Sequence, residues 1–264
     1  QVDVLRLIFK PAWSDIPQPQ EVLAACERIR RHLGTLVDSH LHNPEAFDDI
    51  ASSVIAARDQ ESGAPFSREE LIDQLGVFFL AGHETTASAL TWAFYILADQ
   101  SHWLARLREE IAAVVGDAPM SFEHTKQLPL TKAFFKETLR LYPPITFMPR
   151  VALREATVGG RRLRKGALVM IAPWTLQRHS KWWPDPHAFK PERFLPEQEA
   201  ALVQGAYIPF GQGPHTCVGA GFAQTESVLI LAELVRRFDW LLEPGQTVRP
   251  AARMTTRPAD QVML

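Results

Sequence analysis

A single cysteine in a glycine-rich stretch is the residue of this chain best placed to do chemistry. Cys217 follows Phe210-Gly-Gln-Gly-Pro-His-Thr and precedes Val-Gly219, and an apolar segment of helical character, Phe222–Phe238, comes next. A cysteine offered by such a loop at a helix start is placed to be a thiolate, because backbone N–H groups and the helix N-terminus stabilise negative charge. The glycines let the backbone approach a flat cofactor, and Phe210 can shield the sulfur from water. The alternative is a buried, inert cysteine, as most lone cysteines are.

A polar stretch inside the longest helical pattern is the second candidate. Ala81-Gly-His-Glu-Thr-Thr86 lies within a helical pattern that runs from Arg68 to about Asp99 and is apolar on almost every side between Leu75 and Leu97. Burying a carboxylate and two hydroxyls there costs several kcal/mol unless they find partners, and a mid-helix glycine costs roughly 1 kcal/mol relative to alanine. A purely structural helix would avoid both penalties, so Glu84 and Thr85 are candidates for chemistry. The alternative is a threonine-rich packing kink, in which Thr85 bonds back to the carbonyl four residues earlier.

Two charged motifs and one arginine are weak signals when each is taken alone. Glu137-Thr-Leu-Arg140 places an acid and a base three residues apart on one helical face, which is typical of a surface ion pair. Arg193 lies in a Pro-Glu-Arg-Phe stretch, and Arg150 follows Met-Pro. A guanidinium matches a carboxylate in geometry, so Arg150 could bind one. Its alternative is a solvated surface arginine.

Together and in this order, these motifs resemble those of the cytochromes P450, and the resemblance runs from about Arg68 to the C-terminus. It implies a P450-like fold, mainly α with a small β region, in which a long central helix, a Glu-x-x-Arg helix, a cysteine loop and a final helix follow one another. It also implies non-covalent haem b, with Cys217 as the axial thiolate ligand of the iron. His215 stands where many members carry arginine, and a histidine can still donate to a haem propionate. The residues implied to bind the cofactor are Cys217, His215, Arg150, Phe210, Gly211, Gly213, Gly219, Ala81 and Gly82.

The same resemblance implies an activity and a role for each remaining motif. Glu84 and Thr85 would deliver protons during oxygen activation, while Glu137, Arg140 and Arg193 would form a buried structural triad. The implied activity is haem-thiolate monooxygenation, in which one atom of dioxygen enters a small organic substrate and the other leaves as water. The chain carries no Rossmann glycine pattern and no iron–sulfur cysteine set. We therefore expect electrons from a separate ferredoxin or flavodoxin-type donor and its reductase, docking on the Cys217 side.

The length of the chain leaves alternatives open. With 264 residues it is shorter than members of the family, so we expect a single haem domain over residues 1–264 that lacks the family's N-terminal part. One alternative is a truncated haem-binding core without productive turnover. Another is a haem-thiolate isomerase or peroxygenase, against which the Glu84–Thr85 pair counts. Because Leu75–Leu97 is apolar on nearly every side, we expect an N-terminal fragment or a second copy of the chain to cover that face.

The composition bounds the class of protein and its surroundings. Apolar residues make up 46% and charged residues 22%, which is ordinary for a globular protein. The net charge of −2 gives no sign of a nucleic-acid partner. No apolar run is long enough to span a bilayer, and the N-terminus lacks a signal-peptide pattern, so we expect a cytoplasmic protein without a membrane partner. Cys26 and Cys217 lie far apart and form no disulfide framework.

The hydrophobic pattern predicts the elements that must position these residues. A capping box, Ser67-x-x-Glu70, opens the long helix. After the helices, Thr157–Gly160 is typical of a hairpin turn and Ala167–Ile171 of a strand. Short strands are expected after the last helix, and loops at Phe9–Pro19 and Lys181–Gly205. The other predicted helices are Gln20–His40, Glu45–Arg58 (with Asn43 as its N-cap), His102–Val115, Leu130–Tyr142 and Phe222–Phe238.

Overall fold

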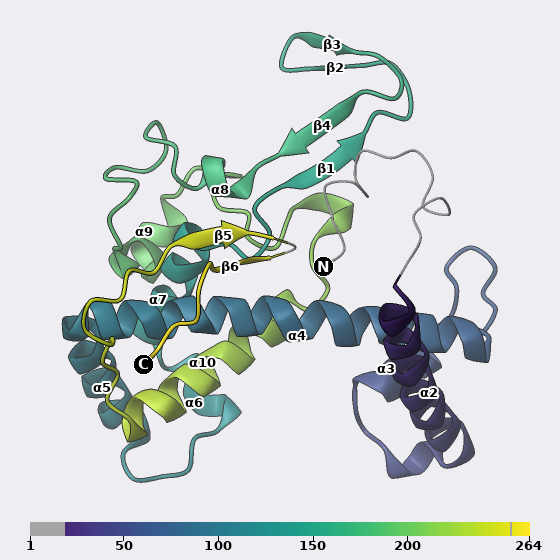
Figure 1. Cartoon of the computed structure of the whole chain (residues 1–264), viewed down its shortest axis with the longest axis horizontal. Coiled ribbons are helices and arrows are strands. Elements are labelled where there is room, and N and C mark those ends of the chain that lie inside the picture. The colour runs from purple at the N-terminus through teal and green to yellow at the C-terminus, as the bar shows by residue number, and fades with distance from the viewer. Residues whose placement is uncertain (1–18, 254) are drawn as a thin grey trace. The chain divides into compact units, whose positions relative to one another are not determined.

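The computed structural model describes residues 19–253 and 255–264, and the loop predicted at Phe9–Pro19 lies outside these residues apart from Pro19. Within them the chain is mainly helical, with three small antiparallel sheets (Figure 1). The chain divides into two compact units, residues 1–83 and 84–264, and the long helix Arg68–Asp99 contributes residues to both. A single haem domain over the whole chain stays a prediction. The helices are α2 (Gln20–His42), η2 (Pro44–Ala46), α3 (Ile50–Ala56), α4 (Arg68–Asp99), α5 (Ser101–Val115), α6 (Phe122–Lys126), α7 (Pro129–Leu141), α8 (Pro173–Leu176), η3 (Pro191–Phe194), α9 (Pro196–Ala200), η4 (Gly213–His215) and α10 (Ala220–Arg237).

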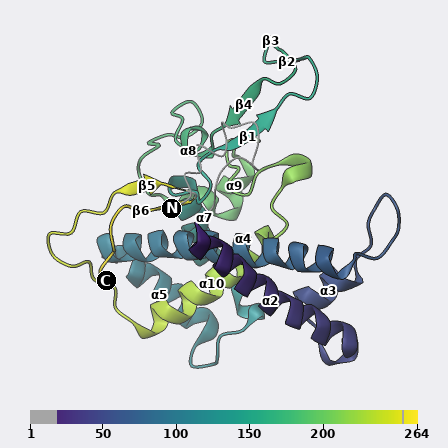
Figure 2. The same ribbon diagram turned by 45° about the vertical axis from the view of Figure 1, so that its right-hand side comes forward.

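The first unit packs α2 and α3 against the first half of α4 (Figure 2). Arg68, at the start of α4, donates to both carboxylate oxygens of Asp38 on α2, at 2.7 and 2.8 Å. The capping box is confirmed: the Ser67 N–H donates to Glu70 at 2.7 Å, and the Glu70 N–H donates back to the Ser67 hydroxyl at 3.3 Å. The small core of the first unit consists of Val37, Ala51, Leu71, Ile72 and Leu75.

The helix predicted at Glu45–Arg58 is partly wrong. Pro44–Ala46 forms only a short 3₁₀ turn, and Asn43 makes no side-chain cap there. The helix begins instead at Ile50, because the Asp49 carboxylate accepts the backbone N–H of Ser52 and so caps it. An aspartate later in the segment thus determined the start, rather than the asparagine before the proline.

The second unit contains the main core, built by α5, α7, α10 and the second half of α4. Trp92 of α4 is fully buried and stacks on Tyr142 after α7, with ring centroids 4.0 Å apart. The predicted helices His102–Val115, Leu130–Tyr142 and Phe222–Phe238 are confirmed to within two residues. No sequence signal indicated α6, because its five residues are too few to show a helical period.

The strands are short and pair as hairpins. The strands are β1 (Met148–Val151), β2 (Ala156–Val158), β3 (Arg161–Leu163), β4 (Leu168–Ile171), β5 (Pro250–Ala252) and β6 (Thr256–Pro258). β1 pairs with β4, β2 with β3 and β5 with β6. The predicted turn between β2 and β3 is confirmed, since both of its glycines have positive φ. The loop predicted at Lys181–Gly205 is interrupted by η3 and α9.

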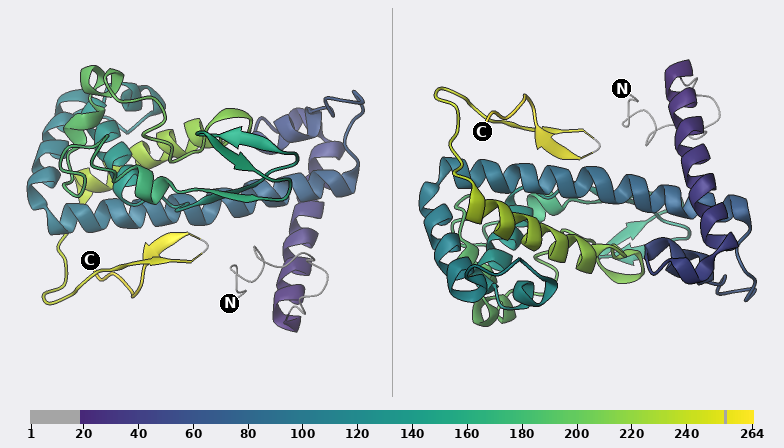
Figure 3. Two further views of the ribbon diagram at one scale, coloured as in Figure 1. Left: turned by 90° about the horizontal axis from the view of Figure 1, so that it is seen from above. Right: turned by 90° about the horizontal axis from the view of Figure 1, so that it is seen from below.

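The C-terminal hairpin runs beside the second half of α4 (Figure 3). The backbone N–H of Thr256 also donates to the Pro144 carbonyl at 2.8 Å, which ties β6 to the segment after α7. The last strands therefore lie against the helix that carries the polar motif.

Candidate functional site

The cysteine loop is held by its own backbone. The Cys217 N–H donates to the Phe210 carbonyl at 2.8 Å, and the Thr216 N–H donates to the Gly213 carbonyl at 3.0 Å. Gly211 and Gly213 have φ of 76° and 78°, a region that other residues rarely adopt. A Cβ on Gly211 would also lie 3.3 Å from the His215 carbonyl oxygen, so the loop is built around glycine at this position.

The loop presents Cys217 just before α10. The helix begins at Ala220, with Gly219 as its N-cap residue. Cys217 is exposed, so the alternative of a buried cysteine is wrong. A Cβ on Gly219 would lie 3.9 Å from the Cys217 sulfur, and its absence leaves space beside the sulfur. Cys217 is therefore an exposed residue that lies directly before a helix N-terminus.

These features fit a haem iron, whose other ligands come largely from the macrocycle. Among the described residues, no three acidic, histidine or cysteine side chains gather as a metal site. A single exposed sulfur is the donor that a haem-thiolate protein must supply. The backbone cradle of Gly211 and Gly219, which added Cβ atoms would narrow, matches the close approach that a flat cofactor needs.

The candidates for the haem propionates lie on neighbouring segments. Arg150 is half-buried on β1, where its guanidinium donates to the Pro149 carbonyl at 2.9 Å. It shares one face of that strand with Met148, whose sulfur would lie 3.6 Å from a Cβ on Gly211. His215 is exposed in η4, inside the cysteine loop. The structure therefore places Arg150 on a strand that adjoins the loop with His215.

Phe210 has a different environment from the rest of the loop. It is half-buried and packs against the main core of the second unit. It thus anchors the start of the loop through its ring and accepts the Cys217 N–H through its carbonyl oxygen.

The polar motif of α4 spans the boundary between the two units. Glu84 is half-buried, and its Oε1 accepts a hydrogen bond from the Thr255 hydroxyl at 2.6 Å. Thr85 is also half-buried. Ala81 and Gly82 are exposed residues of the first unit, and no atom lies within 4 Å of a Cβ added to Gly82. Nothing in the sequence indicated Thr255 as the partner of the acid, because the two residues are 171 positions apart.

The structure brings Glu137, Arg140 and Arg193 together in one buried cluster. Arg140 donates to both carboxylate oxygens of Glu137, at 2.6 and 2.8 Å, and neither side chain is exposed. The Arg193 Nε lies 3.5 Å from Glu137, and its Nη2 donates to the carbonyls of Pro184 and Asp185. Burial raises the pKa of Glu137, and the Arg140 hydrogen bonds oppose that rise. Burial likewise lowers the pKa of Arg193.

A buried glutamine connects this cluster to the cysteine loop, and the sequence analysis missed it. The Gln177 amide N–H₂ donates to the carbonyls of Leu139 and Arg140, at 3.0 and 3.1 Å. Its amide oxygen accepts the backbone N–H of Ile208 at 2.9 Å, two residues before Phe210. Nothing in the sequence singled it out, because its neighbours Thr175 and His179 are exposed and form no apolar pattern around it.

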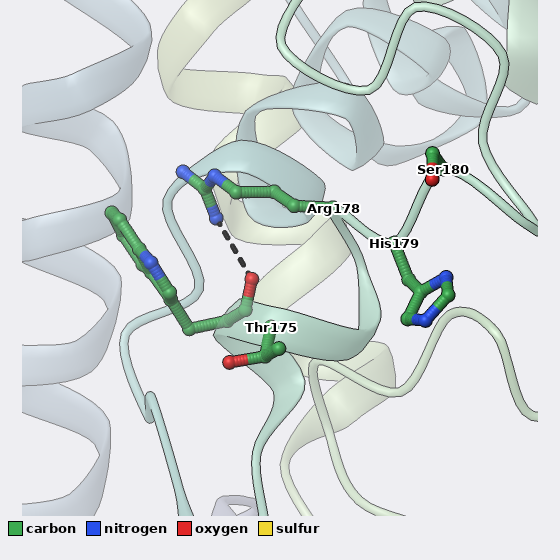
Figure 4. A pocket seen from close by; sticks show the side chains of 5 residues that line it. Thr175, Arg178, His179 and Ser180 are labelled. Atoms are coloured by element: carbon green, nitrogen blue, oxygen red, sulfur yellow. Dashed lines mark hydrogen bonds between the residues drawn. The ribbon is translucent and has the colours of Figure 1, made fainter.

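A pocket of about 380 Å³ lies at α8, lined by residues on either side of Gln177 in the sequence. Arg178 lies on its wall with Thr175, His179 and Ser180 (Figure 4). The Arg178 guanidinium stacks 3.5 Å from the Trp174 ring centroid and donates to the Trp174 carbonyl at 3.3 Å. Burial lowers the pKa of Arg178 to about 10. These contacts are within the chain and hold α8 in place.

The geometry defines a haem-thiolate protein, and the comparisons give its family. The cytochrome P450 family model matches residues 5–263, so the chain belongs to this family. It is 36% identical over 228 residues to cyclooctatin synthase of Streptomyces melanosporofaciens, covering 84% of this chain and 50% of that protein. It is 34% identical over 220 residues to pentalenene oxygenase of Streptomyces avermitilis, covering 83% and 49%. The chain thus spans about half the length of these curated relatives.

A solved structure gives the same result for the fold. The crystal structure of a cytochrome P450 (CYP102L1) matches with a TM-score of 0.83 at 28% identity, covering 92% of this chain and 56% of that one. The predicted family and the predicted fold are therefore confirmed. Haem b with an axial cysteine thiolate is the cofactor of this family, so the cofactor prediction is confirmed as well. None of the helices in the described part of the chain is long and apolar enough to cross a membrane.

Proposed function

We propose that this chain carries the haem-thiolate centre of a monooxygenase that converts RH, O₂, two electrons and two protons into ROH and water. The observation that carries the proposal is the exposed Cys217, in a positive-φ glycine loop directly before α10. Bound haem would supply the oxygen activation, which side chains alone do not provide. The chain's own residues bind the haem, orient it and move protons.

The cysteine loop is proposed to hold the haem on one face. Cys217 provides the thiolate, Gly211 and Gly219 leave room for the macrocycle, and Phe210 anchors the loop. Arg150 and His215 are proposed to donate to the two propionates, since both carry N–H groups on segments that adjoin the loop. Gly213 permits the turn that brings His215 into place, and Ala81 and Gly82 are proposed to face the cofactor from α4.

Glu84 and Thr85 are proposed to move the protons that the reaction consumes. Glu84 is a half-buried carboxylate on an otherwise apolar helix, and a hydroxyl follows it directly in the sequence. A carboxylate at this depth can exchange protons with solvent and pass them inward through the adjacent hydroxyl. The Glu137–Arg140–Arg193 cluster is proposed to be structural, because its hydrogen bonds are within the cluster and to backbone groups, and both guanidinium groups lie over the buried Trp183 ring.

Family members include a bifunctional cytochrome P450/NADPH–P450 reductase from Gibberella moniliformis. We propose that this chain instead takes electrons from a separate ferredoxin or flavodoxin-type donor on the Cys217 side, and that its substrate is a small organic molecule. A cytoplasmic location stays a prediction.

The exposed apolar face of α4 supports a further proposed partner. Val77, Phe79 and Leu80 are 63%, 55% and 61% exposed. We propose that an N-terminal fragment or a second copy of the chain covers these side chains.

The carbon-monoxide spectrum of the reduced protein tests the proposed function. Cys217→Ala should abolish the red-shifted band that marks thiolate ligation, whereas Cys26→Ala should keep it. Cys26 is the matched control because it is also exposed. A band at the position of histidine ligation in fresh parent protein, or a Cys217→Ala variant with the parent spectrum, would contradict the proposal.

The alternative function is a haem-binding core without productive turnover. Labelled dioxygen separates the two functions: a monooxygenase transfers one labelled atom to a probe such as pentalenene, while the core keeps the thiolate spectrum and forms no labelled product.

A further inference from the structure

Three side chains on one face of α4 reach the same turn of the C-terminal hairpin. Glu84, Ser88 and Trp92 are spaced four residues apart, so they lie along one side of the helix. Glu84 accepts the Thr255 hydroxyl at 2.6 Å. The Ser88 hydroxyl and the Trp92 indole N–H both donate to the Thr256 carbonyl, the latter at 3.0 Å.

The turn that meets this face is itself fixed. Thr255 and Thr256 are 2% and 1% exposed, and Trp92 is fully buried. The Thr256 N–H also donates to the Pro144 carbonyl at 2.8 Å, so the turn is held from two sides. The Thr255 hydroxyl therefore meets Glu84 from a buried residue whose neighbour, Thr256, is hydrogen-bonded through both its backbone N–H and its carbonyl.

We propose that Thr255 is a positioning residue that holds the Glu84 carboxylate in the orientation needed for proton transfer; this rests on the role of Glu84 given above. The bond length of 2.6 Å is normal for a hydroxyl that donates to a carboxylate oxygen. A glutamate side chain has several rotatable bonds and loses their freedom only when a partner fixes it. Without the Thr255 hydroxyl, Glu84 can rotate toward solvent.

The orientation of Glu84 should determine which product the electrons form. A correctly placed carboxylate supports the reaction of RH and O₂ with two electrons and two protons to ROH and water. When proton transfer is slow, the same two electrons and two protons reduce O₂ to H₂O₂, and RH is unchanged. Hydrogen peroxide per electron consumed therefore measures the orientation of Glu84 during turnover.

The hairpin supplies its own matched control. The Thr256 hydroxyl is buried and has no hydrogen-bond partner in the described part of the chain. Thr255→Val and Thr256→Val each remove one buried hydroxyl from adjacent residues with little change in shape. Only the first removes a hydrogen bond to Glu84, and Thr255→Ser keeps it.

The first measurement is independent of turnover. Hydrogen–deuterium exchange of the hairpin is followed in the haem-loaded protein by mass spectrometry. Thr255→Val should speed exchange about tenfold, as expected for loss of a hydrogen bond to a charged group. Glu84→Leu should have a similar effect, and the double variant should exchange no faster than either single one. Thr256→Val should match the parent.

The second measurement uses a ferredoxin with its reductase, and pentalenene as the probe. Thr255→Val should raise the peroxide formed per electron severalfold while keeping the thiolate spectrum. Thr255→Ser should have the parent's ratio of peroxide to electrons. Thr256→Val should have the parent's ratio as well. If Glu84→Gln raises peroxide but Thr255→Val does not, the positioning role is wrong and the proposed function stands. If Glu84→Gln leaves the ratio unchanged, the proposed role of Glu84 fails, and the positioning role fails with it. Additive exchange rates in the double variant would also overturn the positioning role.

Discussion

Arg140→Met should strongly destabilise the second unit, because it leaves a buried carboxylate without its main partner. The variant removes two hydrogen bonds to Glu137, at 2.6 and 2.8 Å. Glu137 keeps the Lys190 N–H at 2.8 Å and the Arg193 Nε at 3.5 Å, the latter too long for a good hydrogen bond. Breaking a buried ion pair in this way costs about 3–5 kcal/mol. A domain is typically stable by about 5–15 kcal/mol, so the loss is a large share of the total.

The loss of folding stability in Arg140→Met should also depend on pH. Burial already raises the pKa of Glu137, and the variant removes the largest opposing interaction, so the folded-state pKa rises further. An acid with a higher pKa in the folded protein favours folding at low pH. That stabilisation is lost as the pH rises from the unfolded pKa through the folded one. The loss of stability in Arg140→Met should therefore be larger at pH 8 than at pH 5.

Urea unfolding followed by tryptophan fluorescence measures both effects. Trp183 is fully buried beneath Arg140, at 5.1 Å from the guanidinium carbon to the ring centroid, and so reports on this region. Arg193→Met should cost less, since Arg193 makes the longer contact. Glu137→Leu combined with Arg140→Met should recover much of the loss, because no buried charge remains. A haem-replete Arg140→Met variant with the parent's unfolding midpoint at both pH values would refute the reasoning.

Three further predictions follow from the site. Thr85→Ala should keep the haem spectrum and divert electrons to peroxide; an unchanged product yield per electron would remove Thr85 from the proton path. Gln177→Leu should lower the free energy of unfolding by about 2 kcal/mol or more, because it leaves the Ile208 N–H and two carbonyls without partners, and urea titration would show no change if those bonds were unimportant. Replacing Val77, Phe79 and Leu80 by serine should shift the particle mass in light scattering toward the single chain; a monodisperse, monomeric parent with haem would show that no partner covers this face.

The long helix and the cysteine loop were predictable from the sequence, because their signals are local. The Ser67–Glu70 capping box fixes the start of α4, and the apolar pattern continues to its end at Asp99. The glycines around Cys217 predicted a glycine-rich loop before a helix, and the structure shows that loop with positive φ at Gly211 and Gly213. One local signal was misleading: Asp49 rather than Asn43 caps α3, because the Asp49 carboxylate accepts the Ser52 N–H whereas Asn43 makes no side-chain cap.

Contacts between distant residues could not be predicted from spacing. Glu137 and Arg140 are three residues apart, so their pairing was visible, but their complete burial depends on segments 37 to 48 residues later. Gln177 gave no pattern at all, although it joins α7 to the segment before the cysteine loop. The partner of Glu84 was equally hidden, since a threonine near the C-terminal end carries no periodic or motif signal.

The hairpin on α4 has a consequence for how this chain folds during synthesis. Its turn meets Glu84, Ser88 and Trp92 across separations of 171, 168 and 164 residues. The ribosome therefore completes α4 long before the strands that satisfy the Trp92 indole and the Glu84 carboxylate exist. Contacts of such long sequence separation close late and slowly. Until then this side of the helix is open to water and to other chains, and the Glu84 carboxylate is among the last groups of the second unit to reach its final place.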